Sequence, residues 1–221
     1  MIRDWLLVDE MLSQIEVLSN TDNKPVSIHG NSDELKCIGV GTDAAVFQYV
    51  HTPSYALKLY AEDKRDKIQT EAKVYQELSG SSFFSKCITA RERYLVLSYE
   101  SGITLYDCLL QGIPISPQVI QDVEDARSYA RNRNLNPRDI HLKNVLLQNG
   151  RAKIIDVSEY LQPGNDYRWE HLKRAYHTFY PLIEGNAVPQ WILESIKRRY
   201  NQRNVEANVE FIQDVSKIRI K

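Results

Sequence analysis

Asn144 and Asp156 have the residue types and spacing of a metal site. They stand at the open end of two β-prone runs, residues 144–147 and 152–155, which Asn149-Gly150 separates. An Asn-Gly pair between such runs is the strongest short-range signal of a hairpin, because both central residues of a type I′ turn need positive φ. Folding the chain at this turn brings an amide and a carboxylate together, and these are hard oxygen ligands that Mg²⁺ prefers.

A second carboxylate lies close to this pair in the sequence. In a regular ladder Ile155 lies opposite Asn144, so Asn144 and Asp156 are expected to converge just beyond the last regular pair. Asp139 lies upstream on the entering loop, is not needed as a ligand, and could act as a base. A surface hairpin with polar residues at its open end explains the same pattern without any chemistry.

A lysine and a glutamate upstream of the hairpin are expected to form an ion pair. Lys58 lies in a predicted strand, residues 55–60, and Glu71 falls on the apolar stripe of the next predicted helix, residues 64–78. A carboxylate that faces a core requires a cation, because an unpaired buried charge is very costly. The pair would hold Lys58 where phosphate oxygens can reach it. Alternatively, Glu71 reaches solvent from the margin of the stripe.

A glycine-containing turn separates two predicted strands ahead of Lys58. The strands are residues 35–38 and 45–50, and Gly39 and Gly41 lie between them. Such a turn lets backbone N–H groups approach an anion, because no Cβ is in the way. A plain hairpin is the more common explanation of a lone pattern of this kind.

The composition narrows the class of protein. With 221 residues, of which 43% are apolar, the chain is long enough for one large domain or two lobes. A formal net charge of −1 gives no reason to expect nucleic acid or an acidic membrane surface as a partner. No run approaches the roughly 20 apolar residues of a membrane span. The three cysteines lack metal-ligand spacing and predict reduced thiols in a cytoplasmic protein.

Apolar periodicity assigns the remaining elements. A helix is expected first, then a β-rich region, and then a mostly helical region beyond the polar linker Glu100-Ser101-Gly102. The expected domains are residues 1–30, a helical extension, residues 31–99, and residues 100–221. Besides the segments already named, the sequence predicts a strand over residues 93–99 and helices over residues 3–18, 117–134, 169–180, 190–200 and 205–218.

Taken in order, these parts resemble a protein kinase. The parts are Gly39-x-Gly41-x-x-Ala44-x-Val46, Ala56-x-Lys58, Glu71, the segment from Leu97 to Glu100, Arg138-Asp139 with Asn144, and Asp156. Each is weak alone, but their order is that of the family. The chain looks most similar to small bacterial serine/threonine-kinase-like proteins, over residues 35–160. Asp139-Ile140-His141 is also similar to the aminoglycoside and choline phosphotransferases, which share the fold.

The resemblance implies a role for each matching residue. Lys58, fixed by Glu71, would hold the α- and β-phosphates of ATP, and Asn144 and Asp156 would bind Mg²⁺. Asp139 would orient the acceptor hydroxyl and take its proton. The remaining nucleotide contacts would come from Gly39, Gly41 and Ala44 over the phosphates, from Val46, Ala56 and Leu146 around the adenine, and from the backbone of Ser98, Tyr99 and Glu100.

Two departures from the family pattern concern the substrate. His141 takes the place of the lysine that usually neutralises the γ-phosphate; a protonated histidine could serve in this role, and a neutral one would be weaker. Only about a dozen residues separate Asp156 from the next predicted helix, so the long segment that seats peptide substrates in kinases is missing.

The sequence therefore predicts an α+β, two-lobed, protein-kinase-like fold that binds Mg-ATP between its lobes. The expected reaction is transfer of the γ-phosphate to a hydroxyl, of serine or threonine in a protein. Two alternatives stay open. The short segment after Asp156 also fits a nucleotide-binding regulatory module with little or no transferase activity, and Asp139-Ile140-His141 also fits an enzyme whose acceptor is a small molecule.

Overall fold

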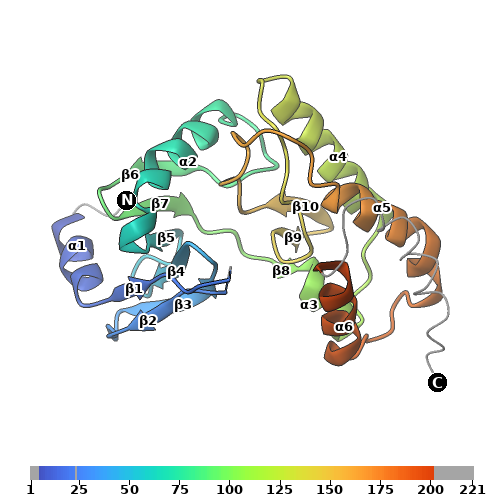
Figure 1. Ribbon diagram of the computed structural model, residues 1–221, viewed down its shortest axis with the longest axis horizontal. Helices are drawn as coiled ribbons and strands as arrows, with labels where there is room; N and C mark the ends of the chain where they lie inside the picture. Colours follow the sequence, from blue (N-terminus) through green and yellow to red (C-terminus); the bar gives the residue numbers. More distant parts are fainter. Residues whose placement is uncertain (1–4, 23, 202–221) are drawn as a thin grey trace. The chain divides into compact units, whose positions relative to one another are not determined.

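The computed structural model describes residues 5–22 and 24–201 and divides the chain into two compact units, residues 1–100 and 101–221. The first unit contains a five-stranded sheet in the order β3-β4-β5-β7-β6, and the second contains a three-stranded sheet in the order β10-β9-β8 (Figure 1). The chain is thus α+β, with a β-rich first part and helices later, as the sequence predicted.

The sheet of the first unit is antiparallel throughout, and β5 lies at its centre. Every residue of β5 except Tyr55 is buried, because helix α2 (Asp66–Glu77) lies on one side and an apolar cluster on the other. The short helix η1 (Glu62–Lys64) links β5 to α2. The sequence did not predict β6. The strands are β3 (Leu35–Val40), β4 (Ala44–Tyr49), β5 (Tyr55–Tyr60), β6 (Cys87–Ala90) and β7 (Tyr94–Ser98).

The amino-terminal segment belongs to the core of the first unit. The predicted helix over residues 3–18 is wrong beyond Ser13, because α1 (Trp5–Ser13) is followed by strand β1 (Glu16–Leu18), which pairs with β2 (Ser27–His29). A helix and a strand both bury apolar residues in this segment, so the apolar pattern in the sequence continues past the end of α1. The buried residues from this segment that join the cluster under the sheet are Val8, Met11, Leu12, Ile15, Val17 and Val26.

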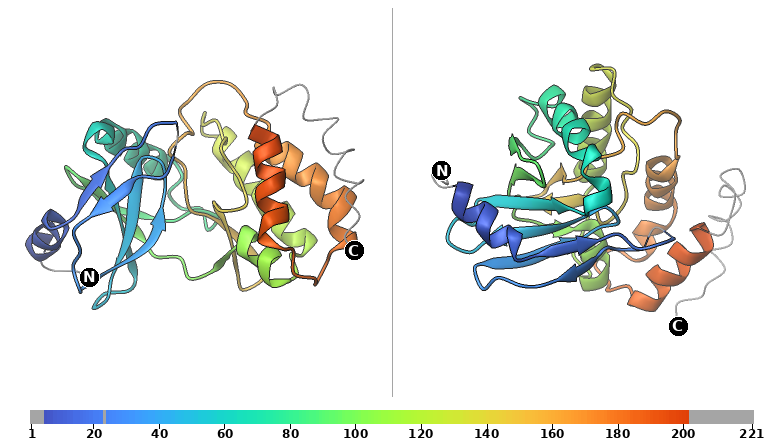
Figure 2. Two further views of the ribbon diagram at one scale, coloured as in Figure 1. Left: turned by 60° about the horizontal axis from the view of Figure 1, so that its bottom comes forward. Right: turned by 60° about the vertical axis from the view of Figure 1, so that its left-hand side comes forward.

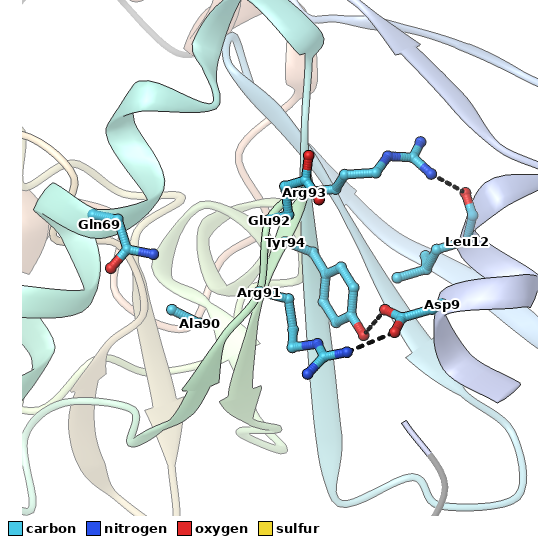
Figure 3. Close-up of a pocket in the computed structure, with 8 residues that line it drawn as sticks. All are labelled: Asp9, Leu12, Gln69, Ala90, Arg91, Glu92, Arg93 and Tyr94. Atoms are coloured by element: carbon cyan, nitrogen blue, oxygen red, sulfur yellow. Dashed lines mark hydrogen bonds and ion pairs between the residues drawn. The ribbon is translucent and has the colours of Figure 1, made fainter. Parts of the chain in front are cut away.

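Polar contacts fix α1 against the turn between β6 and β7. Asp9 accepts hydrogen bonds from the Arg91 guanidinium and from the Tyr94 hydroxyl, both at 2.7 Å (Figure 3). Arg93 donates to the carbonyl oxygens of Leu12 and Ile15, at the end of the helix. Asp9, Leu12, Arg91, Arg93 and Tyr94 are among the residues that line a cavity of about 540 Å³, and none of the side chains that the sequence singled out for chemistry lines it.

The second unit is built around the hairpin that the sequence predicted. Strands β9 (Val145–Gln148) and β10 (Arg151–Ile154) pair antiparallel, and Asn149 and Gly150 between them have φ of 50° and 77°. The short strand β8 (Ile103–Thr104) pairs with β9. The helices are α3 (Leu105–Gln111), α4 (Pro117–Arg131), α5 (Arg168–Phe179), η2 (Tyr180–Leu182) and α6 (Gln190–Asn201), and the predicted helix over residues 205–218 lies outside the described residues.

Charged contacts tie α4 to its neighbours. Asp122, which is fully buried, accepts hydrogen bonds from the Arg151 guanidinium at 2.8 Å and from the Ala152 N–H at 2.9 Å, and so joins α4 to β10. Arg127 contacts Glu170 and so joins α4 to α5, which lies beside it (Figure 2). In the part of the chain that the structure describes, no helix combines the length and apolar character of a membrane span.

Candidate active-site residues

The ion pair between Lys58 and Glu71 is present. Alternate side chains of β5 point to opposite faces of the sheet, so Leu57 and Leu59 join the apolar cluster while Lys58 faces α2. The Lys58 ammonium donates to both carboxylate oxygens of Glu71, at 2.8 and 2.9 Å. The two side chains are only 9% and 1% exposed. Tyr60 lies on the same face of β5, and its hydroxyl also donates to Glu71.

The residues that were predicted to surround the nucleotide in the first unit share this face. Val46 is paired with Lys58 across β4 and β5, and Ala56 is two residues before Lys58 on the same strand. The turn between β3 and β4 is closed by a hydrogen bond of 2.9 Å from the Gly41 N–H to the Ala44 carbonyl oxygen. Val46 and Ala56 therefore lie on the same face of the sheet as Lys58.

Neither glycine of this turn is required by its own backbone. Gly39 and Gly41 do not have positive φ. A Cβ added at Gly39 would meet Val46 at 3.8 Å, and one added at Gly41 would meet the Ala44 carbonyl oxygen at 3.4 Å. Within the first unit, then, both positions have room for a side chain.

Only some backbone groups of the segment from Ser98 to Glu100 could contact a nucleotide as the sequence predicted. The Ser98 N–H donates to the Lys86 carbonyl oxygen and the Tyr99 N–H to the Ser54 carbonyl oxygen, each at 2.8 Å. Neither N–H is therefore available to a ligand. A backbone hydrogen bond to an adenine would have to come from the other backbone groups of this segment. Leu146, the predicted adenine contact from the second unit, is buried in β9.

The loop before β9 holds Asp139 in an unusual backbone conformation. Asp139 has φ of 55°, in the left-handed region that few non-glycine residues adopt. Two contacts fix it there: its N–H donates to the Asp166 carboxylate at 2.7 Å, and its carbonyl oxygen accepts from the Asn144 side-chain amide at 3.1 Å. Such conformations persist only where the surroundings determine them, and they are concentrated at functional sites.

Asn144 and Asp156 lie at the open end of the hairpin. The Ile155 N–H donates to the Asn144 carbonyl oxygen at 3.0 Å, which makes Ile155 the partner of Asn144, with Asp156 next along the chain. One carboxylate oxygen of Asp156 accepts from the Ser158 N–H at 3.0 Å. Among the described residues, no group of three or more histidine, cysteine and acidic side chains could hold a metal ion. An amide and a carboxylate oxygen, as Asn144 and Asp156 carry, are hard ligands that Mg²⁺ accepts alongside water and phosphate.

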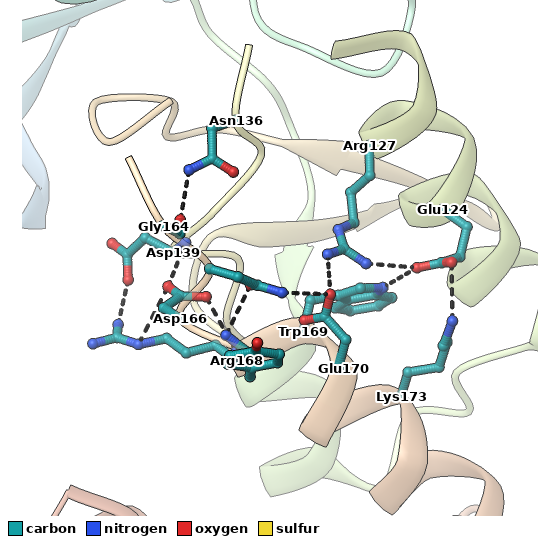
Figure 4. Close-up of polar contacts among 12 residues, drawn as sticks. Glu124, Arg127, Asn136, Asp139, Gly164, Asp166, Arg168, Trp169, Glu170 and Lys173 are labelled. Carbon is teal, nitrogen blue, oxygen red and sulfur yellow. Dashed lines mark hydrogen bonds and ion pairs between the residues drawn. The ribbon is translucent and has the colours of Figure 1, made fainter. Parts of the chain in front are cut away.

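Asp139 is close to several charged groups, which are shown in Figure 4 in part. Burial raises the pKa of its carboxyl to about 6, the Arg168 guanidinium opposes that rise, and Asp156 and Asp166 add to it. Arg168 forms an ion pair with Asp139, and its Nε lies 3.7 Å from Asp166. A carboxylate with a pKa near 6 is better matched to proton abstraction near neutral pH than an ordinary aspartate.

His141 does not have the properties expected of a cation. Burial, with a further contribution from Arg168, lowers its pKa to about 4, so the imidazole is neutral at pH 7. Its Nδ1 accepts a hydrogen bond from the Lys143 N–H at 3.2 Å, which a doubly protonated ring could not do. The expectation that His141 neutralises a γ-phosphate in the protonated form is therefore not supported by its surroundings.

Sequence reasoning missed three residues that the structure brings to these groups. Tyr60 could have been noticed, because it is two residues after Lys58 and so shares its face. Asp166 and Arg168 lie in or next to a polar, glycine-containing segment with no periodicity, and they reach Asp139 from 27 and 29 residues away. No local pattern could have indicated those two contacts.

The segment between Asp156 and α5 is short and held in place. α5 begins at Arg168, about as close to Asp156 as predicted. The Asn136 side-chain amide donates to the carbonyl oxygens of Gln162 and Gly164, both at 2.6 Å. The Arg138 guanidinium donates to the Pro163 carbonyl oxygen at 2.5 Å.

Comparison with known proteins gives a family. No family model matches the chain. Over 200 residues the chain is 34% identical to "Putative serine/threonine-protein kinase YrzF" of Bacillus subtilis (strain 168), and the match covers 87% of this chain and 93% of that relative. The matched part of this chain includes most of both units. The chain therefore belongs to the family of this Bacillus subtilis protein and is a kinase-like protein.

Proposed function

We propose that the protein is an ATP- and Mg²⁺-dependent phosphotransferase, with serine or threonine of a protein as the acceptor. The observation that carries the proposal is the buried pair of Lys58 and Glu71. Burying two charges is expensive, and an apolar pair of similar size is often as stable or more stable. A cation held at one position by a bidentate carboxylate is useful where phosphate oxygens have to be bound.

The turn between β3 and β4 supports the nucleotide part of the proposal. Gly39 and Gly41 are glycines where the fold itself would accept a side chain. Their backbone can approach an anion closely because it carries no Cβ. Lys58 and this turn would bind the phosphates, with Val46 and Ala56 beside the adenine.

Asn144 and Asp156 would hold the metal ion. They offer one amide and one carboxylate oxygen, which suits a cation that takes its other ligands from water and phosphate. The chemistry that a bound Mg²⁺ would supply there is neutralisation of phosphate charge.

Asp139 would act as the base toward the acceptor hydroxyl. The hydroxyl oxygen forms a bond to the γ-phosphorus, the bond from that phosphorus to the bridging oxygen breaks, and ADP leaves. The hydroxyl proton goes to the Asp139 carboxylate. Little more is needed from the protein, because phosphoryl transfer depends mostly on positioning and on stabilisation of charge.

A protein hydroxyl as acceptor is supported by the name of the Bacillus subtilis relative, a "Putative serine/threonine-protein kinase". A small-molecule hydroxyl is the second candidate, and it is favoured by the segment between Asp156 and α5. This segment is short, and the carbonyl oxygens of residues 162–164 in it already accept hydrogen bonds from Asn136 and Arg138. It therefore offers little chain for seating a peptide.

The test is transfer of label from γ-labelled ATP, with Mg²⁺ and with a chelator, to the protein itself, to a generic protein acceptor and to a panel of small alcohols and sugars. We expect Mg²⁺-dependent transfer. Asp139→Asn should reduce its rate by roughly 10²-fold or more, because a general base contributes about that much. ATP affinity, measured by calorimetry, should change less than about threefold.

Asp125→Asn is the matched control, because Asp125 is an exposed aspartate on α4 whose contact is with Gln121. It should transfer phosphate at the wild-type rate. An unchanged rate in Asp139→Asn would falsify the assignment of the base. ATP binding without any turnover would instead support a regulatory module, and absence of ATP binding would reject the proposed function altogether.

A further inference from the structure

Phosphoryl transfer needs a positive charge beside the base. Negative charge spreads over the three equatorial oxygens of the phosphoryl group as it moves, and cations close to those oxygens stabilise it. This need, which rests on the proposed function, calls for a cationic side chain next to Asp139.

The basic side chains of the loop that carries Asp139 are occupied elsewhere. Arg138 donates to the Pro163 carbonyl oxygen. The Lys143 ammonium lies 4.5 Å from the centre of the Tyr106 ring. The Nδ1 atom of His141 accepts a hydrogen bond from the backbone, so this ring is not a cation.

Arg168 is the basic residue that contacts Asp139. Its Nη1 donates to Oδ1 of the Asp139 carboxylate (Figure 4). Within residues 5–22 and 24–201, no hydrogen bond reaches Oδ2 of Asp139 or comes from Nη2 of Arg168. One carboxylate oxygen thus remains for a hydroxyl, and guanidinium donors remain for an oxygen next to it.

The position of Arg168 is unfavourable for a purely structural cation. It is the first residue of α5, where the helix dipole repels positive charge. Its side chain is 43% exposed, so its pair with Asp139 contributes little to stability. Asp166 and Asp139 hold the guanidinium at this place, on a side chain that is partly exposed to solvent.

We infer that Arg168 is a further catalytic residue, whose guanidinium binds an oxygen of the phosphoryl group during its transfer. In that step Arg168 keeps its proton and forms no covalent bond. Nη1 remains on Oδ1 of Asp139, and Nη2 donates to the phosphoryl oxygen. Arg168 thereby supplies from the start of α5 the cation that the loop of Asp139 lacks.

The experiment compares wild type with Arg168→Gln, Arg168→Lys and Arg174→Gln. Arg174 is an exposed arginine on the same helix, so its variant removes the same charge away from Asp139. Two quantities are measured: the rate of label transfer from γ-labelled ATP, and the thermal stabilisation by Mg-ADP with and without aluminium fluoride. Mg-ADP with aluminium fluoride imitates the phosphoryl group in transfer.

Arg168→Gln should lose roughly 10²-fold in transfer rate, as is typical for one donor to a developing charge. It should keep the stabilisation by Mg-ADP and lose the increment that aluminium fluoride adds. Arg168→Lys should recover part of both, since it restores the charge without the planar fork. Arg174→Gln should match wild type in both.

The outcomes separate this inference from the proposed function. A wild type that neither transfers phosphate nor is stabilised by Mg-ADP overturns both. An active wild type with an unaffected Arg168→Gln overturns the inference alone. So does a variant that loses rate but keeps the aluminium fluoride increment, because Arg168 would then act through Asp139.

Discussion

The two units hold their charged side chains in different ways. In the first unit, Lys58 and Glu71 are almost completely buried, and the pair lies between a central strand and a helix. In the second unit, the side chains of Arg168 and Asp139 are 43% and 30% exposed, and the backbone of a loop positions the carboxylate. The first arrangement holds the Lys58 ammonium at one position. The second leaves Arg168 and Asp139 accessible to a ligand.

The difference follows from the cost of desolvation. A buried charge that loses its partner has no water to replace it, so the penalty is several kcal/mol. A half-exposed charge is solvated at once when its partner leaves, so such pairs contribute about 0–1 kcal/mol. Lys58 and Glu71 should therefore behave as part of the fold, and Arg168 and Asp139 as separable groups. Asp122 and Arg151 are intermediate, with side chains 0% and 61% exposed.

The largest effect is expected at Glu71. Glu71→Gln removes the counter-charge and leaves the Lys58 ammonium buried, so the free energy of unfolding should fall by about 3–5 kcal/mol. Guanidinium unfolding followed by fluorescence measures it. Lys67→Ala is the control, because Lys67 on the same helix as Glu71 forms a more exposed ion pair with Asp43. It should cost no more than about 1 kcal/mol.

A double variant separates folding from binding at the same place. Lys58→Met with Glu71→Leu replaces both charges with apolar side chains, which should restore most of the stability that Glu71→Gln loses. The restored protein should still fail to bind ATP. If Glu71→Gln cost as little as Lys67→Ala, the contrast between the two units would disappear.

A smaller loss is expected at Asp122. Burial alone would raise the pKa of its carboxyl, but hydrogen bonds from Arg151, from the Ala152 N–H and from Gln118 outweigh this, and the pKa is lowered. A lowered pKa contributes stability above the unfolded value of about 3.9, and this stability is lost as the pH falls through the folded value. Asp122→Ala should cost about 2–3 kcal/mol at pH 7, because the Ala152 N–H is left unpaired.

The pH dependence of stability in Asp122→Ala distinguishes loss of the carboxylate's charged hydrogen bonds from simple loss of packing. The difference in stability between wild type and Asp122→Ala should be constant from pH 5 to 8 and should shrink below about pH 4. Arg151→Ala should cost about 1 kcal/mol, because the arginine is mostly exposed and the Ala152 bond survives. A difference that does not change with pH would show that the charge of Asp122 is irrelevant.

Asp139 should show the opposite sign. Its pKa is raised to about 6, so the folded protein is favoured by protonation. The corresponding stability is present below the unfolded pKa of about 3.9 and is lost as the pH rises through about 6. Asp139→Asn should therefore stabilise the protein at pH 8, by about 1 kcal/mol after screening by solvent, and not at pH 4.

Thermal unfolding at several pH values measures this gain. Asp125→Asn, with an exposed carboxylate, serves again as the control and should change nothing. A gain at Asp139 together with loss of transferase activity is the pattern of a functional residue that is retained at a cost in stability. Destabilisation at pH 8 would mean that Asp139 is structural.

The sequence predicted best where the partners are close along the chain. Asn149-Gly150 determines the turn of the hairpin through its need for positive φ, and Lys58 and Glu71 lie on a strand and a helix that follow one another. In both cases, periodicity and turn chemistry are sufficient. The helix over residues 3–18 was predicted too long because Ile15, which continues the apolar spacing of the helix, is buried just before β1 begins.

Long-range contacts of polar side chains were not predictable. Asp166 and Arg168 meet Asp139 across a segment without apolar periodicity, and only the folded chain defines that proximity. The neutral form of His141 likewise depends on its burial, which its neighbours in the sequence do not reveal. For these residues a single sequence gives the type of side chain but not its surroundings.

The smallest effects on stability are expected at two glycines, one in each unit. Gly150 has φ of 77°, so Gly150→Ala should cost about 1 kcal/mol and leave ATP affinity unchanged. Gly41 does not have positive φ, and an added Cβ would be in ordinary contact with the Ala44 carbonyl oxygen, at 3.4 Å. Gly41→Ala should therefore change stability by less than about 0.5 kcal/mol, since lower entropy of the unfolded chain offsets the crowding.

The effect on ATP affinity should be larger for Gly41→Ala than for Gly150→Ala, the reverse of their effects on stability. If the turn between β3 and β4 covers the phosphates, the new methyl group of Gly41→Ala lies between backbone and anion, and the dissociation constant for ATP should rise about tenfold, which corresponds to about 1.4 kcal/mol. Calorimetric titration of both variants with Mg-ATP measures this. Equal ATP affinity in Gly41→Ala and Gly150→Ala would mean that the glycine at position 41 does not serve a ligand. Since the fold does not require a glycine there, neither folding nor ATP binding would then explain it.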